Sequence, residues 1–177
     1  VENGTLTQEQ ADLIKSLIIR RKNLVISGET GSGKTTLMNT LLKEIPSSDR
    51  LFIIEDTREL QCSAPNKVSV LTGDNYTARK AVKNAMRFRP DRIIVGEVRD
   101  GAALDLLEAW NTGHPGGMCS IHANSPATVK LRLRSLIQQV SVSPQQDLID
   151  ATIDAVVQIT LCKDGIRRVT DIKVFNE

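Results

Sequence analysis

The stretch from Gly28 to Thr36 reads GETGSGKTT and matches the pattern G-x-x-x-x-G-K-[ST], which is typical of a loop that binds phosphate groups. The apolar run from Leu24 to Ile26 leads into this loop as a buried strand would. After the loop, Leu37, Leu41 and Leu42 fall at the spacing of an apolar helix face. An ordinary glycine-rich turn is the alternative interpretation, but the order strand, loop and helix favours phosphate binding.

The residue types in this loop fit a phosphate ligand. Gly28, Gly31 and Gly33 allow backbone conformations that are closed to larger residues, so consecutive N–H groups can converge on a phosphate. The start of the following helix adds partial positive charge. We expect Lys34 to reach the β- and γ-phosphates and the Thr35 hydroxyl to hold a magnesium ion. The predicted ligand is a nucleoside triphosphate with Mg²⁺, bound by Gly28, Glu29, Thr30, Gly31, Ser32, Gly33, Lys34, Thr35 and Thr36.

Apolar runs predict the strands of a sheet. They lie at 24–26, 51–54, 68–71, 93–95 and 118–121. Helical patterns separate them, and this alternation indicates a doubly wound, mainly parallel α/β sheet. The C-terminal part differs, because strand-like segments at 156–161 and 166–174 are joined through Asp164 and Gly165, which is typical of a hairpin. We expect a single α/β domain over residues 1–177, with helices flanking the sheet and a C-terminal antiparallel hairpin.

Several helix boundaries can also be predicted. A helix from 78 to 88 is followed by Pro90, which cannot continue it. The pairs Ser125-Pro126 and Ser143-Pro144 each place a capping serine before a proline at the first helical position. We therefore expect one helix to start at each pair.

Acidic residues follow two of the predicted strands. Glu55 and Asp56 come directly after one apolar run, and Glu97 follows another after an intervening Gly96. Strand ends of a parallel sheet meet at one edge, so these acids should lie beside the phosphate-binding loop. A triphosphatase needs one carboxylate to orient water and another acidic group for the magnesium shell. Glu55 and Glu97 are the candidates, with Glu97 expected to contact the metal through water.

Both histidines of the chain lie in the segment from 112 to 124. His122 falls at a predicted strand end, which favours a sensor of the γ-phosphate over a core histidine. For His114 the two interpretations are balanced. Among the arginines around Glu97, Arg87 and Arg99 are candidates either for acting on the γ-phosphate of a neighbouring subunit or for bracing the acids.

Composition limits the function classes. The net charge of +2 and the single Trp and Tyr give no sign of a nucleic-acid carrier, so we expect no direct sequence-specific nucleic-acid binding. Three widely spaced cysteines favour reduced thiols in a cytosolic protein. No apolar run approaches the roughly 18 to 20 residues that span a bilayer, so any membrane association should be peripheral. The first residue, Val1, suggests a processed product or an excised domain.

Four blocks together resemble a known family, the ATPases of type II and type IV secretion, type IV pili and conjugation. GETGSGKTT resembles its Walker A motif, IEDTREL at 54–60 its aspartate box, RFRPDRIIVGEVRD at 87–100 its Walker B motif, and TGHPGGMCSIHANS at 112–125 its histidine box. The four-cysteine zinc module usual in type II members is missing. The chain is therefore most similar to the conjugal-transfer ATPases of type IV secretion.

This resemblance implies a RecA-like P-loop NTPase fold that binds ATP and Mg²⁺. It implies that Lys34 and Thr35 bind phosphate and metal, that Glu55 is the general base, that Glu97 positions magnesium and water, and that His122 reports on the γ-phosphate. It also implies a homo-hexamer, located in the cytoplasm and peripheral on the inner membrane, with inner-membrane secretion-system proteins as partners. The family also carries an N-terminal domain that closes over the nucleotide, and from the resemblance we expect that this sequence does not contain it.

Two other functions stay open at this point. A RecA-like nucleic-acid motor would need a basic channel and hydrolysis stimulated by DNA. A small-molecule kinase would need a lid and an acceptor pocket, and it would consume ATP only when an acceptor is present. No insertion in the sequence looks like a lid.

Overall fold

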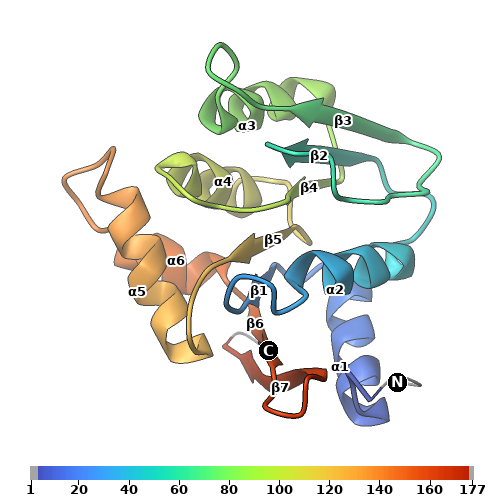
Figure 1. The fold of residues 1–177 in the computed structure, drawn as a ribbon. Helices are drawn as coiled ribbons and strands as arrows, with labels where there is room; N and C mark the ends of the chain where they lie inside the picture. The colour runs from blue at the N-terminus through green and yellow to red at the C-terminus, as the bar shows by residue number, and fades with distance from the viewer. Residues whose placement is uncertain (1–3, 176–177) are drawn as a thin grey trace.

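A computed structural model describes residues 4–175, and one seven-stranded sheet runs through them in the order β3-β2-β4-β5-β1-β6-β7 (Figure 1). The strands are β1 Leu24–Ser27, β2 Leu51–Glu55, β3 Lys67–Leu71, β4 Arg92–Val95, β5 Met118–Ile121, β6 Ala155–Leu161 and β7 Arg167–Val174. Strands β1 to β6 pair in parallel, and β7 pairs antiparallel to β6. The predicted RecA-like α/β fold with a C-terminal hairpin is confirmed.

Helices cover both faces of the sheet. Figure 1 shows α1 and α2 on one side of it and α4, α5 and α6 on the other. The helices are α1 Gln8–Ile19, α2 Lys34–Leu41, α3 Ala78–Ala85, α4 Ala102–Asn111, α5 Pro126–Ile137 and α6 Gln146–Thr152, with short 3₁₀ helices η1 at Leu42–Glu44 and η2 at Met86–Phe88. Because the parallel strands are buried on both faces, they appear in the sequence as continuous apolar runs.

Alternate residues of each central strand enter two separate cores. In β2, Phe52 and Ile54 join the core beneath α3 to α6, while Leu51 and Ile53 join the core beneath α1 and α2. Trp110 of α4 fills the first core and donates from Nε1 to the Ile93 carbonyl at 3.1 Å, so its one polar atom is satisfied. The two cores hold the carboxyl ends of the strands in line along one edge of the sheet.

One predicted helix boundary is wrong, and the others are confirmed. The helix expected at Ser143-Pro144 starts at Gln146, because Gln145 has a φ of +53° and Ser143 Oγ accepts from the Gln145 N–H, which closes a separate turn. The helix expected over 78–88 is present, as α3 to Ala85 and then as η2 to Phe88. Arg89, with a φ of +49°, then ends the segment. The start at Ser125-Pro126 is confirmed, with a capping box.

The C-terminal hairpin has a loop of three residues rather than two. Gly165 has a φ of +78° and donates its N–H to the Cys162 carbonyl at 2.9 Å, while the Cys162 N–H donates to Ile166. This is a turn followed by a glycine in the left-handed region. It places the first residue of β7, Arg167, close to the phosphate-binding loop.

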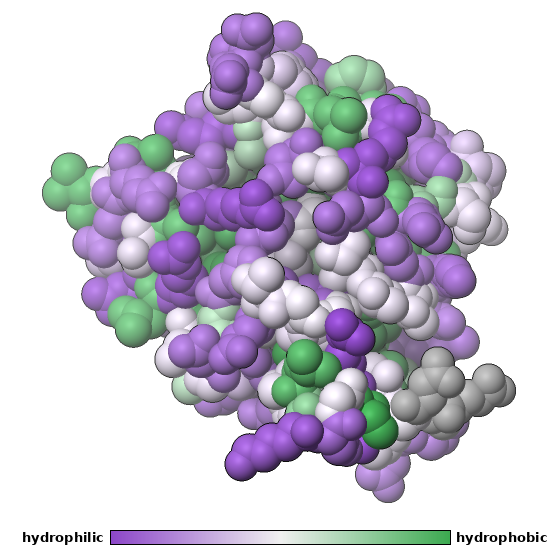
Figure 2. All heavy atoms as spheres, viewed as in Figure 1, coloured by the Kyte–Doolittle hydropathy of each residue, from purple (hydrophilic) through white to green (hydrophobic). Residues whose placement is uncertain are grey.

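The surface is mostly hydrophilic on the face seen in Figure 2, and its hydrophobic residues form separate small patches. Among the helices of residues 4–175, none combines the length and apolar character that crossing a bilayer requires.

Candidate nucleotide-binding site

The glycines of the phosphate-binding loop have two different reasons to be glycine. Gly31 and Gly33 have φ values of +75° and +97°, in the left-handed region, and Gly33 is the N-cap of α2. Gly28 does not lie in that region. A Cβ at Gly28 would lie 2.3 Å from the Ile159 carbonyl oxygen and 2.5 Å from Ser32 Oγ. Close packing against β6, and not backbone conformation as the sequence suggested, therefore explains this glycine.

Lys34, the first residue of α2, is buried and faces the loop that precedes it. Its Nζ donates to the carbonyl oxygens of Gly28 at 2.9 Å and Glu29 at 2.8 Å. A third contact, at 3.4 Å, joins Nζ to Nδ1 of His122 at the carboxyl end of β5. Desolvation lowers the pKa of the Lys34 ammonium from its ordinary value, although the negative charge of Glu97 acts in the opposite direction.

A cavity of about 560 Å³ opens beside this loop. Its lining combines loop residues with the ends of β4 and β5 and with β7. The lining residues are Thr30, Gly31, Gly33, Lys34, Thr35, Thr36, Glu59, Glu97, Arg99, Ser120, His122 and Arg167. Backbone N–H groups of a helix start, a lysine, hydroxyls and carboxylates thus meet in one place, which is the set of groups that a metal-bound phosphate requires.

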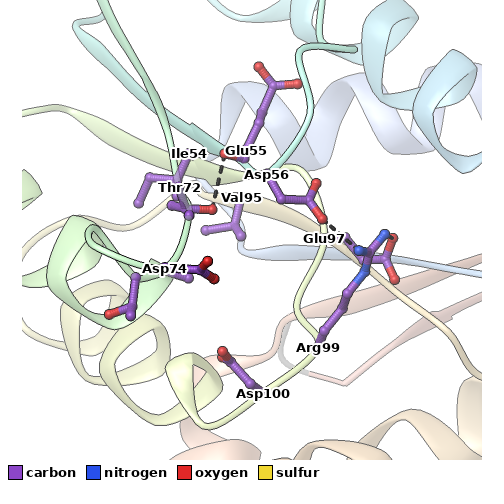
Figure 3. Close-up of a pocket in the computed structure, with 12 residues that line it drawn as sticks. Ile54, Glu55, Asp56, Thr72, Asp74, Val95, Glu97, Arg99 and Asp100 are labelled. Atoms are coloured by element: carbon purple, nitrogen blue, oxygen red, sulfur yellow. Dashed lines mark hydrogen bonds and ion pairs between the residues drawn. The ribbon is translucent and has the colours of Figure 1, made fainter.

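Four side chains that follow strands β2, β4 and β5 form a chain of polar contacts. Glu97 lies 2.9 Å from His122 Nε2 through Oε1 and accepts from Arg99 Nη2 at 2.8 Å through Oε2. Arg99 also donates to Asp56 Oδ2 at 2.5 Å, and Figure 3 shows its guanidinium between the two acids. An ammonium can only donate, so a hydrogen bond from Lys34 needs Nδ1 of His122 to be unprotonated.

These neighbours set the charge of Glu97. Burial by itself raises the pKa of the Glu97 carboxyl, but the hydrogen bond from Arg99 and the positive groups around it outweigh burial and hold the pKa below its ordinary value. The hydrogen bond to Glu97 in turn raises the pKa of Arg99. Both side chains are therefore charged at neutral pH, and Arg99 contacts two acids of its own chain.

Glu55 is buried at the end of β2, and its carboxylate is held by backbone groups. Oε1 accepts from the N–H of Glu59 at 2.9 Å and of Leu60 at 2.7 Å. Gly96 allows this position, because a Cβ there would lie 3.3 Å from Glu55 Cγ. Glu55, Thr35 and Glu97 line a second, smaller cavity of about 90 Å³ beside the first. The structure thus places Glu55 next to the phosphate-binding helix, as the sequence predicted.

Glu59 is a site residue that the sequence reasoning did not single out. Its Oε2 accepts from the Thr35 hydroxyl at 3.1 Å, and its carbonyl accepts from Asn39 Nδ2 at 3.1 Å. Asn39 Oδ1 accepts from the Gln61 N–H at 2.7 Å, so one amide holds this segment at two points. The only signal for Glu59 in the sequence was that the 54–60 block contains a second glutamate after Glu55. Its closeness to Thr35 depends on the tertiary fold.

Arg87 and His114 lie away from the cavity. Arg87 is exposed in η2, which precedes β4, whereas Glu97 and Arg99 follow the other end of that strand. Arg87 therefore cannot brace the acids of its own chain, and that expectation is wrong. His114 Nδ1 lies 2.8 Å from the Pro90 carbonyl oxygen, so this histidine links two loops at the amino end of β4. The side chain of Glu29 is exposed, and only its carbonyl meets Lys34.

The donor set fits a magnesium nucleotide better than a protein-only metal site. Within residues 4–175 there is no group of three or more His, Cys, Asp or Glu side chains that could hold a metal ion. Magnesium in phosphate sites is held by one or two protein oxygens together with phosphate oxygens, which matches the Thr35 hydroxyl and the nearby carboxylates. Ser32 Oγ, buried within the loop, has no hydrogen-bond partner among the described residues, so the loop has a polar atom left for a ligand.

The fold and the phosphate-binding loop define the class of this protein, an α/β protein of the RecA-like P-loop type. The chain belongs to the family of type II/IV secretion system proteins, which it matches over residues 2–175. The resemblance seen in the four sequence blocks is thereby confirmed.

Individual relatives agree with this family. The probable conjugal transfer protein TrbB of Sinorhizobium fredii is 49% identical over 175 residues, covering 97% of this chain and 54% of that protein. The type IV secretion system protein VirB11 of Bartonella quintana is 35% identical over 166 residues, covering 86% and 46%. The crystal structure of the VirB11 ATPase from the Brucella suis type IV secretion system, in complex with sulphate, superposes with a TM-score of 0.87 at 31% identity, covering 94% and 52%. The chain thus spans about half the length of these relatives.

Proposed function

We propose that this chain binds ATP with Mg²⁺ and hydrolyses it, as the ATPase domain of a type IV secretion or conjugation motor. The observation that carries the proposal is that one cavity is lined by Lys34, Thr35, Glu59, Glu97 and His122, with Glu55 in the smaller cavity beside it. Similarity to the Brucella suis VirB11 ATPase supports it, since that protein was solved with sulphate, a tetrahedral anion.

The residues have distinct proposed roles. The loop N–H groups and Lys34 bind the phosphates, because a triphosphate needs positive charge and donors in a fixed geometry. Glu55 is the general base, since the two backbone bonds to Oε1 fix the direction of its carboxylate. His122 reports on the γ-phosphate, because it already contacts both Lys34 and Glu97. Bound magnesium, held by Thr35 and by Glu97 through water, would neutralise charge on the phosphate oxygens.

Two variants test this function directly. Lys34→Ala should abolish ATP binding or turnover, whereas Glu55→Gln should still bind the nucleotide but lose hydrolysis. Calorimetric nucleotide binding and phosphate release are the measurements for both variants. Unchanged turnover in Glu55→Gln would remove Glu55 from the role of base, and unchanged ATP binding in Lys34→Ala would contradict the nucleotide site itself.

The proposed assembly is a homo-hexamer, peripheral on the cytoplasmic side of the inner membrane, that works with secretion-system proteins to transfer substrates or assemble a pilus. We further propose that residues 1–177 act as one ATPase domain, since one sheet connects β1 to β7. In this assembly Arg87, exposed on the edge away from its own site, stays a candidate for acting on a neighbouring subunit. Light scattering and ATPase activity, measured over a range of protein concentrations, test the assembly.

The same assays separate the two rival functions. A RecA-like nucleic-acid motor predicts that single- or double-stranded DNA raises the hydrolysis rate. A small-molecule kinase predicts that ATP is consumed only in the presence of an acceptor alcohol or nucleotide. We expect basal hydrolysis without either addition, and no stimulation by DNA.

A further inference from the structure

Arg167, the first residue of β7, lies across the phosphate-binding loop. Its Nε donates to the carbonyl oxygen of Gly31 at 3.0 Å. A Cβ built on Gly33 would lie 2.7 Å from Arg167 Cδ, so the stem of the arginine packs directly on the loop backbone. The C-terminal hairpin therefore brings to the nucleotide cavity a residue that lies more than 130 positions from the loop in sequence.

Among the cations that line this cavity, Arg167 differs in its partners. The Arg99 guanidinium is shared by the carboxylates of Glu97 and Asp56. Within residues 4–175, Arg167 has no acidic partner, although the next residue, Arg168, pairs with Asp164 at 2.6 Å. The Nε of Arg167 is engaged by Gly31, which fixes the side chain and leaves its two terminal nitrogens as donors at the cavity.

We propose that Arg167 is a second phosphate-binding cation of this site, acting on the nucleotide bound by its own chain; this inference rests on the proposed function. A magnesium-bound triphosphate keeps about two negative charges, and Lys34 offsets one of them. Arg99 is already neutralised by two acids, so it has little net charge to offer. Arg167 supplies the remaining charge, and a guanidinium can donate two bonds to one phosphate group.

The test compares neighbouring arginines of the same strand. Binding of ADP and of a non-hydrolysable ATP analogue, each with MgCl₂, is measured by calorimetry for the unmodified chain, Arg167→Ala, Arg168→Ala and Arg167→Lys. Arg167→Ala should bind both nucleotides about three- to tenfold more weakly, whereas Arg168→Ala should stay within about twofold. Arg167→Lys keeps the positive charge but loses the planar guanidinium that can donate two hydrogen bonds to one phosphate. It should recover part of the affinity.

The salt dependence of binding separates a phosphate contact from a role in shaping the loop. Loss of a phosphate-binding charge should flatten the fall of affinity with NaCl in Arg167→Ala relative to the unmodified chain. An unchanged salt dependence, with Arg167→Lys no better than Arg167→Ala, would mean that the bond to Gly31 only holds the loop, and would overturn the inference. Equal losses in Arg167→Ala and Arg168→Ala would overturn it as well.

Failure of this inference can be told apart from failure of the proposed function. If the unmodified chain binds nucleotide, Lys34→Ala does not, and Arg167→Ala binds as the unmodified chain does, only the role of Arg167 is wrong. If the unmodified chain binds no nucleotide, the function itself is wrong. Thermal unfolding of the variants without nucleotide checks that each is folded.

Discussion

Thr35 and Glu59 are joined by a hydrogen bond of 3.1 Å, from the Thr35 hydroxyl to the Glu59 carboxylate. This bond connects the first turn of α2 with the segment that follows β2. Thr35 is the predicted magnesium ligand, so the Glu59 carboxylate is a candidate acceptor for the waters of that ion. The phosphate-binding helix and the acidic strand ends therefore form one unit.

Replacing Glu59 should change the magnesium requirement. In Glu59→Ala, we expect the Mg²⁺ concentration for half-maximal ATP turnover to rise about fivefold or more, because a negative acceptor near the metal is lost. Magnesium titrations of phosphate release measure this. Glu108→Ala, an exposed glutamate of α4, is the control and should not change the titration. An unaltered magnesium titration in Glu59→Ala would contradict the expectation.

Asn39 is predicted to act as a positioning residue. Asn39 lies in α2, and its side-chain amide binds the backbone of Glu59 and Gln61. The backbone N–H of Glu59 in turn donates to the Glu55 carboxylate. Asn39→Ala should therefore lower kcat about tenfold while leaving ADP affinity within about twofold.

The control is Asn84→Ala, which removes a side-chain amide bond to the Tyr76 hydroxyl on α3, away from the site. It should leave kcat nearly unchanged. Equal decreases of kcat in both variants would show that Asn39 matters only for general stability.

His122→Ala should reduce turnover more than ADP binding. The ring contacts Lys34 and Glu97, which line the same cavity, and ADP has no γ-phosphate. We expect kcat to fall about tenfold or more, with the ADP dissociation constant within about threefold. Steady-state kinetics and calorimetry measure the two quantities. A proportionate loss of ADP binding would indicate a structural role instead.

The contribution of Glu97 to stability should depend on pH. Its pKa in the folded chain lies below the ordinary value of 4.5, so the ionised carboxylate stabilises the fold above that value, and the contribution is lost as the pH falls through the lowered folded pKa. The free energy of unfolding lost in Glu97→Gln should therefore be largest near neutral pH and shrink on acidification. Urea unfolding at a series of pH values measures it. A loss that is constant with pH would rule out the ionic contribution.

Asp49→Ala should strongly destabilise the chain. Asp49 accepts from Nε of the buried Arg92 at 2.6 Å, at the amino edge of the sheet. Removing one partner of a buried pair leaves an uncompensated charge, and we expect a loss of about 3 kcal/mol in the free energy of unfolding. Urea unfolding at pH 7 tests this.

Glu44→Ala is the matched control for that loss, because its pair with Lys15 is exposed. It should cost much less than Asp49→Ala does. Similar losses in the two variants would mean that burial of Arg92 does not matter.

Much of the fold could be predicted from local patterns. The strand from Leu24, the loop and α2 follow from an apolar run, three glycines and a helical repeat, each a property of neighbouring residues. The start of α6 could not be predicted, because the positive φ of Gln145 overrides the Ser-Pro signal at 143 and 144. Strand ends of a parallel sheet meet at one edge, so the positions of Glu55 and Glu97 could be expected as well.

The sequence by itself determined the residue types of the phosphate-binding loop and indicated that the core strands run parallel. Both depend on residue type and short-range spacing. Only the tertiary structure decided which distant side chains meet there: Glu59 at Thr35, Arg99 between Asp56 and Glu97, and Arg167 over Gly31. It also separated Arg87 from the site. The physical reason is that these contacts depend on where packed strands and loops end in space, and no local pattern encodes a distance between segments far apart in the chain.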